Sequence, residues 1–201
     1  MKVNEIFSSI QGEGRYAGYP ALFIRLSGCT RNCNFCDTKY HTKGIDTSVE
    51  ELVDVIKKSR QSIIVWTGGE PTIQLEEIND VIKLFPEYMR HHLETNGDII
   101  VNYSSFDYVC FSPKDIITLK NVLNNIKLQT LLSSCYDIKV VTDGIMSLDL
   151  CQDATMLMPL TTYDAEKDKL IKQTVWSLCV NMKKKFCLRQ HVEVWNKKVG
   201  I

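Results

Sequence analysis

Segments of strand-like and helix-like pattern alternate along the chain. Strand-like segments, each followed within two positions by Gly, Pro, Asn or Cys, occur at 21–26, 62–67, 91–95, 106–111, 136–142 and 154–158. Apolar residues recur with helical spacing at 47–60, 75–85, 119–132 and 163–182, and a last strand is predicted at 185–194. Strict alternation predicts parallel βαβ units. Their number is too small for a closed barrel of about 250 residues. We therefore predict an α/β fold, an open, partial (β/α) barrel of about six parallel strands, as a single domain over residues 1–201.

Composition narrows the class of protein without identifying it. The 201 residues are 44% apolar and carry 24 basic and 24 acidic side chains, which is typical of an ordinary globular domain. A net charge of zero argues against a general nucleic-acid-binding surface. The longest apolar run has four residues, far below the roughly 20 of a membrane span, and the N-terminus lacks a signal-peptide core. We expect a cytoplasmic protein with neither a nucleic acid nor a membrane as partner.

Three of the eight cysteines form a compact motif directly after the strand at 21–26. Cys29, Cys33 and Cys36 have the spacing Cys-x3-Cys-x2-Cys, whereas the other five are scattered and are expected to pack in the core. Three thiolates can hold a cubic iron–sulfur cluster and leave one iron open for chemistry. A zinc site completed by His41, or a fourth structural ligand from a scattered cysteine, is the alternative. The position after the first strand of an alternating chain favours the catalytic interpretation.

Three further polar segments stand at successive strand ends. They are Gly68-Gly69-Glu70-Pro71, Glu94-Thr95-Asn96-Gly97 and Ser112-Pro113-Lys114. Each alone is typical of a turn. Because the carboxyl ends of parallel strands meet at one edge of a sheet, we expect all three to lie beside the cysteine loop.

Together with the cysteine loop, these segments resemble the radical S-adenosylmethionine superfamily. Within it, Ile10-Gln11-Gly12-Glu13-Gly14, Arg25 and Cys36-Asp37-Thr38 resemble the 7-carboxy-7-deazaguanine synthases. The resemblance implies a 4Fe–4S cluster on the three cysteines and bound S-adenosylmethionine. It assigns to the cofactor the residues Gly68, Gly69, Glu70, Gly97, Ser112, Pro113 and Lys114, with Glu70 accepting from the methionine ammonium.

The same resemblance implies a radical SAM lyase of queuosine or archaeosine biosynthesis. Its substrate is 6-carboxy-5,6,7,8-tetrahydropterin, which becomes 7-carboxy-7-deazaguanine with loss of ammonia. The implied substrate-side residues are Ile10, Gln11, Gly12, Glu13, Arg25, Thr95 and His191, and Thr38 is implied as a ligand of Mg²⁺. The alternatives are an ion pair for Arg25, a structural histidine for His191 and a loop hydrogen bond for Thr38.

Partners and competing functions follow from the same comparison of motifs. The resemblance implies a flavodoxin-like or ferredoxin-like reductant and a homodimer. The segment Leu188-Arg189-Gln190-His191 lacks the proline that the family often has there, and contact between the Ile201 carboxylate and substrate stays open. The competing hypotheses are an activase that abstracts hydrogen from a glycine of a partner protein, a radical SAM enzyme for a related pterin-like substrate, and a colourless zinc-binding module.

Overall fold

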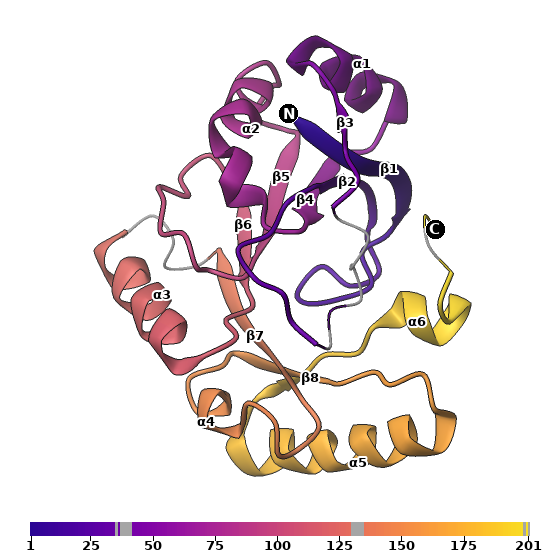
Figure 1. Ribbon diagram of the computed structural model, residues 1–201, viewed down its shortest axis with the longest axis vertical. Coiled ribbons are helices and arrows are strands. Elements are labelled where there is room, and N and C mark those ends of the chain that lie inside the picture. Colours follow the sequence, from indigo (N-terminus) through magenta and orange to yellow (C-terminus); the bar gives the residue numbers. More distant parts are fainter. Residues whose placement is uncertain (35, 37–41, 130–134, 199, 201) are drawn as a thin grey trace.

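The computed structural model describes residues 1–34, 36, 42–129, 135–198 and 200. The fold is built on one curved, open sheet (Figure 1). In this part of the chain the strands follow the order β3-β1-β2-β4-β5-β6-β7-β8-β9. Their bounds are β1 Lys2–Ile10, β2 Pro20–Leu26, β3 Ile45–Asp46, β4 Ile63–Gly68, β5 Arg90–Thr95, β6 Tyr108–Phe111, β7 Tyr136–Thr142, β8 Met156–Pro159 and β9 Lys185–Phe186. From β2 to β9 all neighbours are parallel, and β1 and β3 are antiparallel additions. The predicted open α/β architecture is confirmed.

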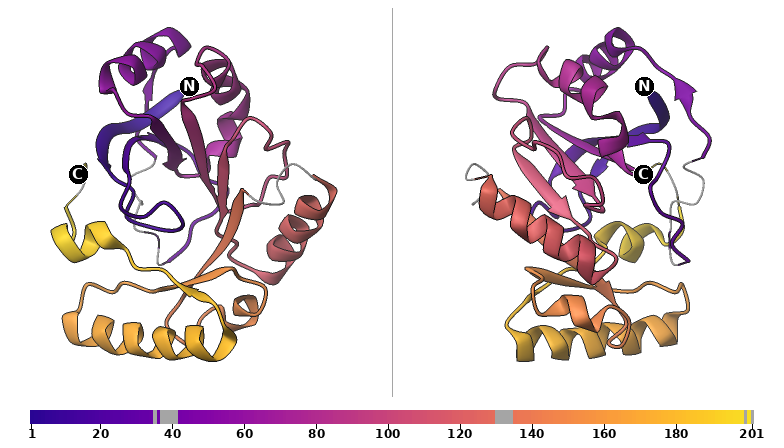
Figure 2. Two further views of the ribbon diagram at one scale, coloured as in Figure 1. Left: turned by 180° about the vertical axis from the view of Figure 1, so that it is seen from behind. Right: turned by 60° about the vertical axis from the view of Figure 1, so that its left-hand side comes forward.

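Helices cover the outside of this sheet (Figure 2). Their bounds are α1 Val49–Ser59, the 3-10 helix η1 Pro71–Gln74, α2 Leu75–Ile82, α3 Ile116–Leu128, α4 Leu148–Cys151, α5 Ala165–Met182 and α6 Gln190–Trp195. The start of α1 follows from its sequence, because Ser48 and Glu51 form a capping box. The Glu51 amide donates to Ser48 Oγ (3.1 Å), and the Ser48 amide donates to Glu51 Oε2 (2.8 Å).

The core lies between the sheet and these helices. Trp66 of β4, Leu93 of β5 and Phe111 of β6 are almost fully buried together with apolar side chains of α1, α2, α3 and α5. The scattered cysteines were expected among such residues. Four of them are buried and unpaired, namely Cys110, Cys151, Cys179 and Cys187, whereas Cys135 is half-buried. Burial and free thiols agree with packing residues.

The end of the chain departs from the predicted strand at 185–194. Only Lys185–Phe186 joins the sheet, and residues Gln190–Trp195 form α6. The apolar residues of this segment suit a strand, but Val194 and Trp195 are exposed. The chain leaves the sheet because the Gln190 amide donates to the Gly12 carbonyl at 2.9 Å, which fixes the start of α6 near the loop after β1.

The long strand β1 is absent from the prediction. Its apolar residues do not alternate regularly, and most of its side chains are only partly buried. Antiparallel pairing with β2 holds it, with Ile6 opposite Ile24 and Phe7 opposite Phe23. The rings of Phe7 and Phe23 stack at 5.1 Å. Such a pairing depends on a partner strand and leaves a weak local signal.

His91 and His92 begin β5 and are almost fully buried. The Trp66 indole donates to His91 Nδ1 at 3.1 Å, and the His92 ring lies 4.3 Å from the Tyr16 ring. Burial lowers the pKa of each histidine to about 4. Both are therefore neutral core residues at neutral pH.

These histidines predict that the protein loses stability in mild acid. The unfolded chain binds protons near pH 6.5 while the folded chain does not until about pH 4. The free energy of unfolding should therefore fall by about 1.4 kcal/mol per pH unit and per histidine as pH drops through this window. His92→Phe keeps a ring beside Tyr16 and should remove about half of this slope in urea unfolding at pH 4 to 7. An unchanged slope would contradict the burial argument.

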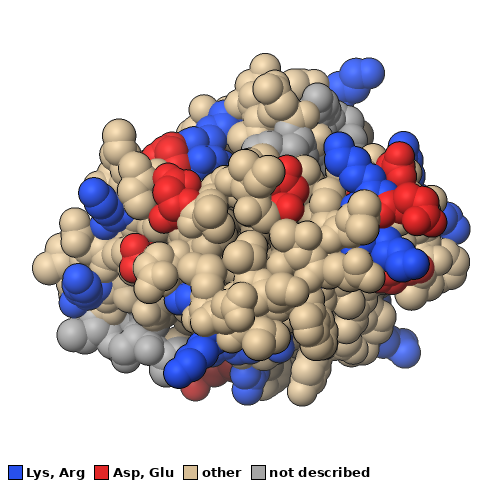
Figure 3. All heavy atoms as spheres, turned by 90° about the horizontal axis from the view of Figure 1, so that it is seen from below, with Lys and Arg blue, Asp and Glu red and all other residues tan. Residues whose placement is uncertain are grey.

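The surface carries charges of both signs. Figure 3 shows lysine, arginine, aspartate and glutamate side chains interspersed on the face seen from below. This mixture agrees with the balanced composition of the chain. Among the described helices, none combines the length and the apolar character that crossing a bilayer requires.

Candidate active site

A cavity of about 520 Å³ opens at the carboxyl ends of the parallel strands. This is the edge at which chemistry gathers in such folds. Most predicted site residues line it, namely Ile10, Gln11, Gly12, Glu13, Arg25, Cys29, Cys33, Cys36, Gly68, Gly69, Thr95, Ser112, Lys114 and His191. Glu70, Gly97 and Pro113 are not among the lining residues. Thr38 and His41 lie outside the described residues, so the magnesium and zinc hypotheses that use them stay predictions.

The cysteine loop leaves β2 through Gly28, whose φ of 88° lies in the left-handed region that favours glycine. Cys29, Cys33 and Cys36 are half-buried and line the cavity. Among the described residues, no three His, Cys, Asp or Glu side chains form a group that could hold a metal ion. Each cysteine of a four-iron cluster ligates a different iron, so its thiols need not meet at one point. Soft thiolates at one wall of a cavity suit such a cluster.

Two glycines join the cysteine loop to the end of β4. A Cβ at Gly68 would lie 2.2 Å from the Leu26 carbonyl oxygen, and one at Gly69 would lie 1.7 Å from the Gly28 oxygen. The Gly69 amide donates to Leu26 (3.0 Å) and the Glu70 amide donates to Gly28 (2.8 Å). No side chain fits between these backbones, so the motif brings bare backbone to the cavity beside the thiols.

Glu70 has a different place from the one expected. Its carboxylate is fully buried and accepts hydrogen bonds from the Thr72 amide and hydroxyl (3.0 and 2.6 Å), the Thr95 hydroxyl (2.7 Å) and the Asn96 amide (2.7 Å). Burial raises the pKa of Glu70 and outweighs these hydrogen bonds, which act in the opposite direction. Glu70 thus ties the end of β4 to the turn after β5. The geometry gives no support to the expected contact with a methionine ammonium.

Gly97 and Lys114 belong to the two other strand-end motifs and have different structural roles. Gly97 has a φ of 79°, and a Cβ there would lie 2.6 Å from Val122 Cγ2, so this glycine allows α3 to pack closely. The Lys114 ammonium donates to Ser112 Oγ at 2.8 Å, and both residues line the cavity. Of the cofactor residues implied by resemblance, Gly68, Gly69, Ser112 and Lys114 therefore face the cavity.

The opposite wall holds a cluster of buried charges. Lys139 donates to Glu13 Oε2 (2.5 Å) and Glu94 Oε2 (3.0 Å), and Arg189 donates to Glu13 Oε1 (3.1 Å). Gln11 lies 3.5 Å from Glu94 Oε1. All five residues line the cavity. We call Glu13, Glu94, Lys139 and Arg189 the charged wall.

The charged wall shifts the pKa values of its two carboxylates in opposite directions. Burial alone would raise the pKa of Glu13, but Lys139 and Arg189 outweigh it and hold this pKa well below its usual range. Burial raises the pKa of Glu94 despite Lys139. Burial would lower the pKa of Lys139, but its acidic neighbours Cys110, Glu13 and Glu94 raise it. Glu13 is thus an ionised acceptor at neutral pH, with Lys139 as its cation.

Sequence reasoning missed Lys139, Arg189 and the role of Glu94. Lys139 is the lone cation in the segment Tyr-Asp-Ile-Lys-Val-Val-Thr of β7, and a charge inside a buried strand signals a buried partner. Arg189 stands two positions before His191, with no local pattern to mark it. Glu94 was expected only as part of a strand-end motif.

Arg25 and His191 combine structural contacts with access to the cavity. Arg25 of β2 donates to Glu5 Oε2 at 3.1 Å and lies 5.6 Å from the centre of the Phe7 ring, so the ion pair considered as an alternative is present. His191 of α6 packs against Gly12, where a Cβ would lie 2.2 Å from His191 Nδ1. The motif near residue 12 and the C-terminal histidine are therefore complementary in shape.

An open parallel sheet with a three-cysteine loop at the carboxyl end of its first parallel strand defines the class of radical SAM proteins. The family model described as the Radical SAM superfamily matches residues 23–121. This class uses a 4Fe–4S cluster and S-adenosylmethionine.

Two relatives and one solved structure indicate a particular family within this class. The 7-carboxy-7-deazaguanine synthase of Hyperthermus butylicus is 30% identical, over 96% of this chain and 92% of the relative. That of Methanospirillum hungatei is 33% identical, over 79% of this chain and 68% of the relative. The crystal structure of QueE from Escherichia coli has 26% identity and a TM-score of 0.70, with 94% of each chain covered. The chain belongs to the 7-carboxy-7-deazaguanine synthase family.

Proposed function

We propose that this chain converts 6-carboxy-5,6,7,8-tetrahydropterin to 7-carboxy-7-deazaguanine with loss of ammonia, a step of queuosine or archaeosine biosynthesis. One observation carries the proposal. The same cavity has cysteine thiols and bare glycine backbone on one wall and a buried, hydrogen-bonding charged wall on the other. The first wall suits a cluster with its cofactor, and the second suits a small polar heterocycle.

The residues of the first wall fit the cofactors of the class. Cys29, Cys33 and Cys36 would hold the 4Fe–4S cluster, and the backbone of Gly68 and Gly69 would admit the methionine part of S-adenosylmethionine. When bound, these groups supply a radical that removes a hydrogen atom from the substrate. The protein's part is to hold the reactants at a fixed distance and to exclude water.

The second wall supplies recognition of the substrate. The ionised Glu13 accepts hydrogen bonds, so it can bind the N–H edge of the pterin, and the Gln11 amide adds a donor and an acceptor. Arg25 can bind the substrate carboxylate through its planar guanidinium. Ile10, Gly12, Thr95 and His191 would shape the remaining surface.

Four parts of the proposal rest on the family resemblance. Thr38 contributes an oxygen to a Mg²⁺ ion beside the substrate carboxylate, since Mg²⁺ takes few protein ligands together with substrate oxygens. A flavodoxin-like or ferredoxin-like protein supplies the electron. The chain acts as a homodimer, which sedimentation at micromolar concentration tests. The enzyme works in the cytoplasm, which fractionation of cells tests.

Arg25 provides a test of substrate recognition. Arg25→Lys keeps the charge but loses the planar guanidinium, so we expect KM for the pterin to rise by about tenfold or more, while kcat changes less. Arg25→Lys also weakens the ion pair with Glu5, which is a structural effect. Glu5→Gln weakens the same ion pair while keeping Arg25, so it is the matched control. Equal increases of KM in both variants would assign Arg25 to the ion pair alone.

The decisive assay for the reaction is product formation under anaerobic conditions. The reconstituted protein receives reductant, S-adenosylmethionine, Mg²⁺ and 6-carboxytetrahydropterin, and mass spectrometry follows 7-carboxy-7-deazaguanine. We expect product and a lower rate without Mg²⁺. Cleavage of S-adenosylmethionine without product would favour an activase or another pterin-like substrate, and a colourless protein would favour the zinc-binding module.

A further inference from the structure

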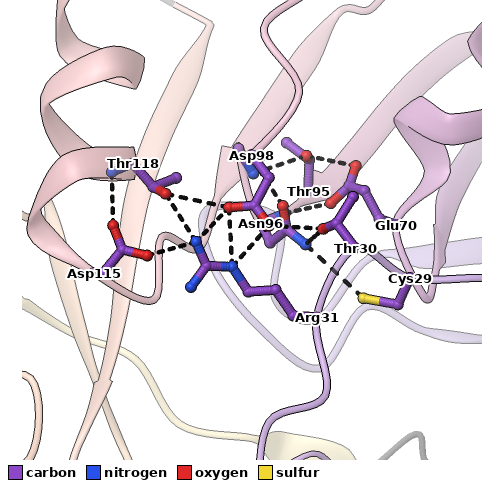
Figure 4. A network of polar contacts seen from close by, with 10 residues as sticks. Cys29, Thr30, Arg31, Glu70, Thr95, Asn96, Asp98, Asp115 and Thr118 are labelled. Atoms are coloured by element: carbon purple, nitrogen blue, oxygen red, sulfur yellow. Dashed lines mark hydrogen bonds and ion pairs between the residues drawn. The ribbon is translucent and has the colours of Figure 1, made fainter.

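The first residues of the cysteine loop are all held by one turn, the segment Asn96–Asp98 that follows β5 (Figure 4). The Asn96 side-chain amide lies 3.9 Å from Cys29 Sγ and donates to Thr30 Oγ1 at 2.9 Å. The Thr30 hydroxyl in turn donates to Asp98 Oδ2 at 2.7 Å. The loop is therefore bound side chain by side chain to a neighbouring strand end.

Arg31 makes the strongest of these contacts. Its Nε lies 2.9 and 2.7 Å from the two carboxylate oxygens of Asp98, and Nη2 donates to Asp115 Oδ2 (2.5 Å) and Thr118 Oγ1 (2.9 Å). The Thr118 hydroxyl also donates to Asp98 at 3.1 Å. Arg31 and Asp98 are mostly buried, with side chains 25% and 16% exposed. Burial opposes ionisation of Asp98, but hydrogen bonds from Arg31 and Thr30 outweigh it and lower the pKa of Asp98.

The partners of Arg31 are themselves fixed. The Asn96 amide donates to the buried Glu70 at 2.7 Å, and the Asp98 amide donates to Asn96 Oδ1 at 2.8 Å. Asp115 caps the N-terminus of α3, where it accepts from the Thr118 amide at 2.8 Å. One guanidinium thus connects the cysteine loop to the end of β5 and to the start of α3.

We propose that Arg31 is a positioning residue that holds Cys29 and Cys33 in the arrangement required to retain the cluster. The inference rests on the proposed function in one respect, that these thiols hold the cluster. Because Cys29, Thr30 and Arg31 are already held by these contacts, cluster binding need not supply the free energy of ordering them. Groups that orient metal ligands typically change metal retention by about 10- to 100-fold.

Retention of iron tests this role without the reaction. Arg31→Lys keeps the charge and loses the planar guanidinium, and Asp115→Asn keeps an N-cap residue but removes one carboxylate partner. The matched control is Arg15→Met, which removes an ion pair with Asp137 (2.9 Å). Neither residue takes part in the contacts that hold Cys29, Thr30 and Arg31. The holoproteins are challenged anaerobically with an iron chelator, and the loss of absorbance near 400 nm is followed.

We expect Arg31→Lys to lose iron at least 10-fold faster than wild type, Asp115→Asn to be intermediate and Arg15→Met to match wild type. If Arg31→Lys retains iron as well as wild type, or if Arg15→Met loses iron as fast as Arg31→Lys, this inference is overturned while the proposed function stands. If Arg31→Lys fails to fold, Asp115→Asn decides. A wild-type protein that binds no cluster defeats the proposed function and this inference with it.

Discussion

Lys139→Met is expected to lower the free energy of unfolding by about 3–5 kcal/mol, a large part of the stability of an ordinary domain. The lysine is the shared cation of two buried carboxylates, with donor distances of 2.5 and 3.0 Å to Glu13 and Glu94. Met has a similar length and no charge, so Glu94 loses its cation and Glu13 keeps only Arg189. Chemical unfolding at pH 7 measures the change.

The pH dependence and a double variant identify the cause of this loss. Without Lys139 the carboxylates take up protons more readily in the folded chain than in the unfolded chain, so the deficit should shrink as pH falls toward the ordinary carboxylate range. Lys139→Met combined with Glu94→Gln removes one unpaired charge and should recover part of the stability. If the double variant is no more stable than the single one at pH 7, unpaired charge is not the cause.

Gly68→Ala should be strongly damaging although it adds only one methyl group. Gly68 has a φ of 119°, and an added Cβ would lie 2.2 Å from the Leu26 carbonyl oxygen, so β2 and β4 would have to separate. The backbone conformation alone costs about 1–2 kcal/mol. We expect a clearly larger loss of stability and at least 10-fold weaker binding of S-adenosylmethionine, measured by unfolding and by calorimetry on the holoprotein.

Gly18→Ala is the matched control for this substitution. Gly18 has a φ of 96°, but an added Cβ would meet nothing within 4 Å. It therefore carries a comparable conformational cost without the steric clash, and it should leave cofactor binding unchanged. Equal losses in the two variants would contradict the conclusion that close backbone approach at Gly68 builds the cofactor wall.

The parts of the fold that could be predicted are those whose signal is local. Strand-like and helix-like patterns and turn residues located the parallel strands and the main helices, among them α1 within the predicted range 47–60. Strand β1 was missed because its stability comes from pairing with β2. The segment after Phe186 was misassigned because its apolar residues suit a strand, whereas the Gln190 amide donates to the Gly12 carbonyl and the chain continues as α6.

In the candidate site, too, the local features could be predicted from the sequence and the contacts between distant residues could not. The cysteines and the glycines of the strand ends are recognisable because their chemistry and spacing are local. In the charged wall Glu13 pairs with Lys139 and Arg189. In the cysteine loop Arg31 pairs with Asp98 and Asp115. These partners are far apart in sequence, and only the folded sheet brings them together. Glu70 was placed in the right motif, but its burial could be seen only in the structure.

The most direct test of the account is the ratio of 7-carboxy-7-deazaguanine formed to S-adenosylmethionine consumed in the anaerobic assay. The account predicts many product molecules per chain with no matching loss of S-adenosylmethionine, because the family resemblance implies that the reaction regenerates this cofactor. Steady consumption of S-adenosylmethionine with no deazaguanine product would contradict the claim that one cavity holds this cofactor and this pterin together.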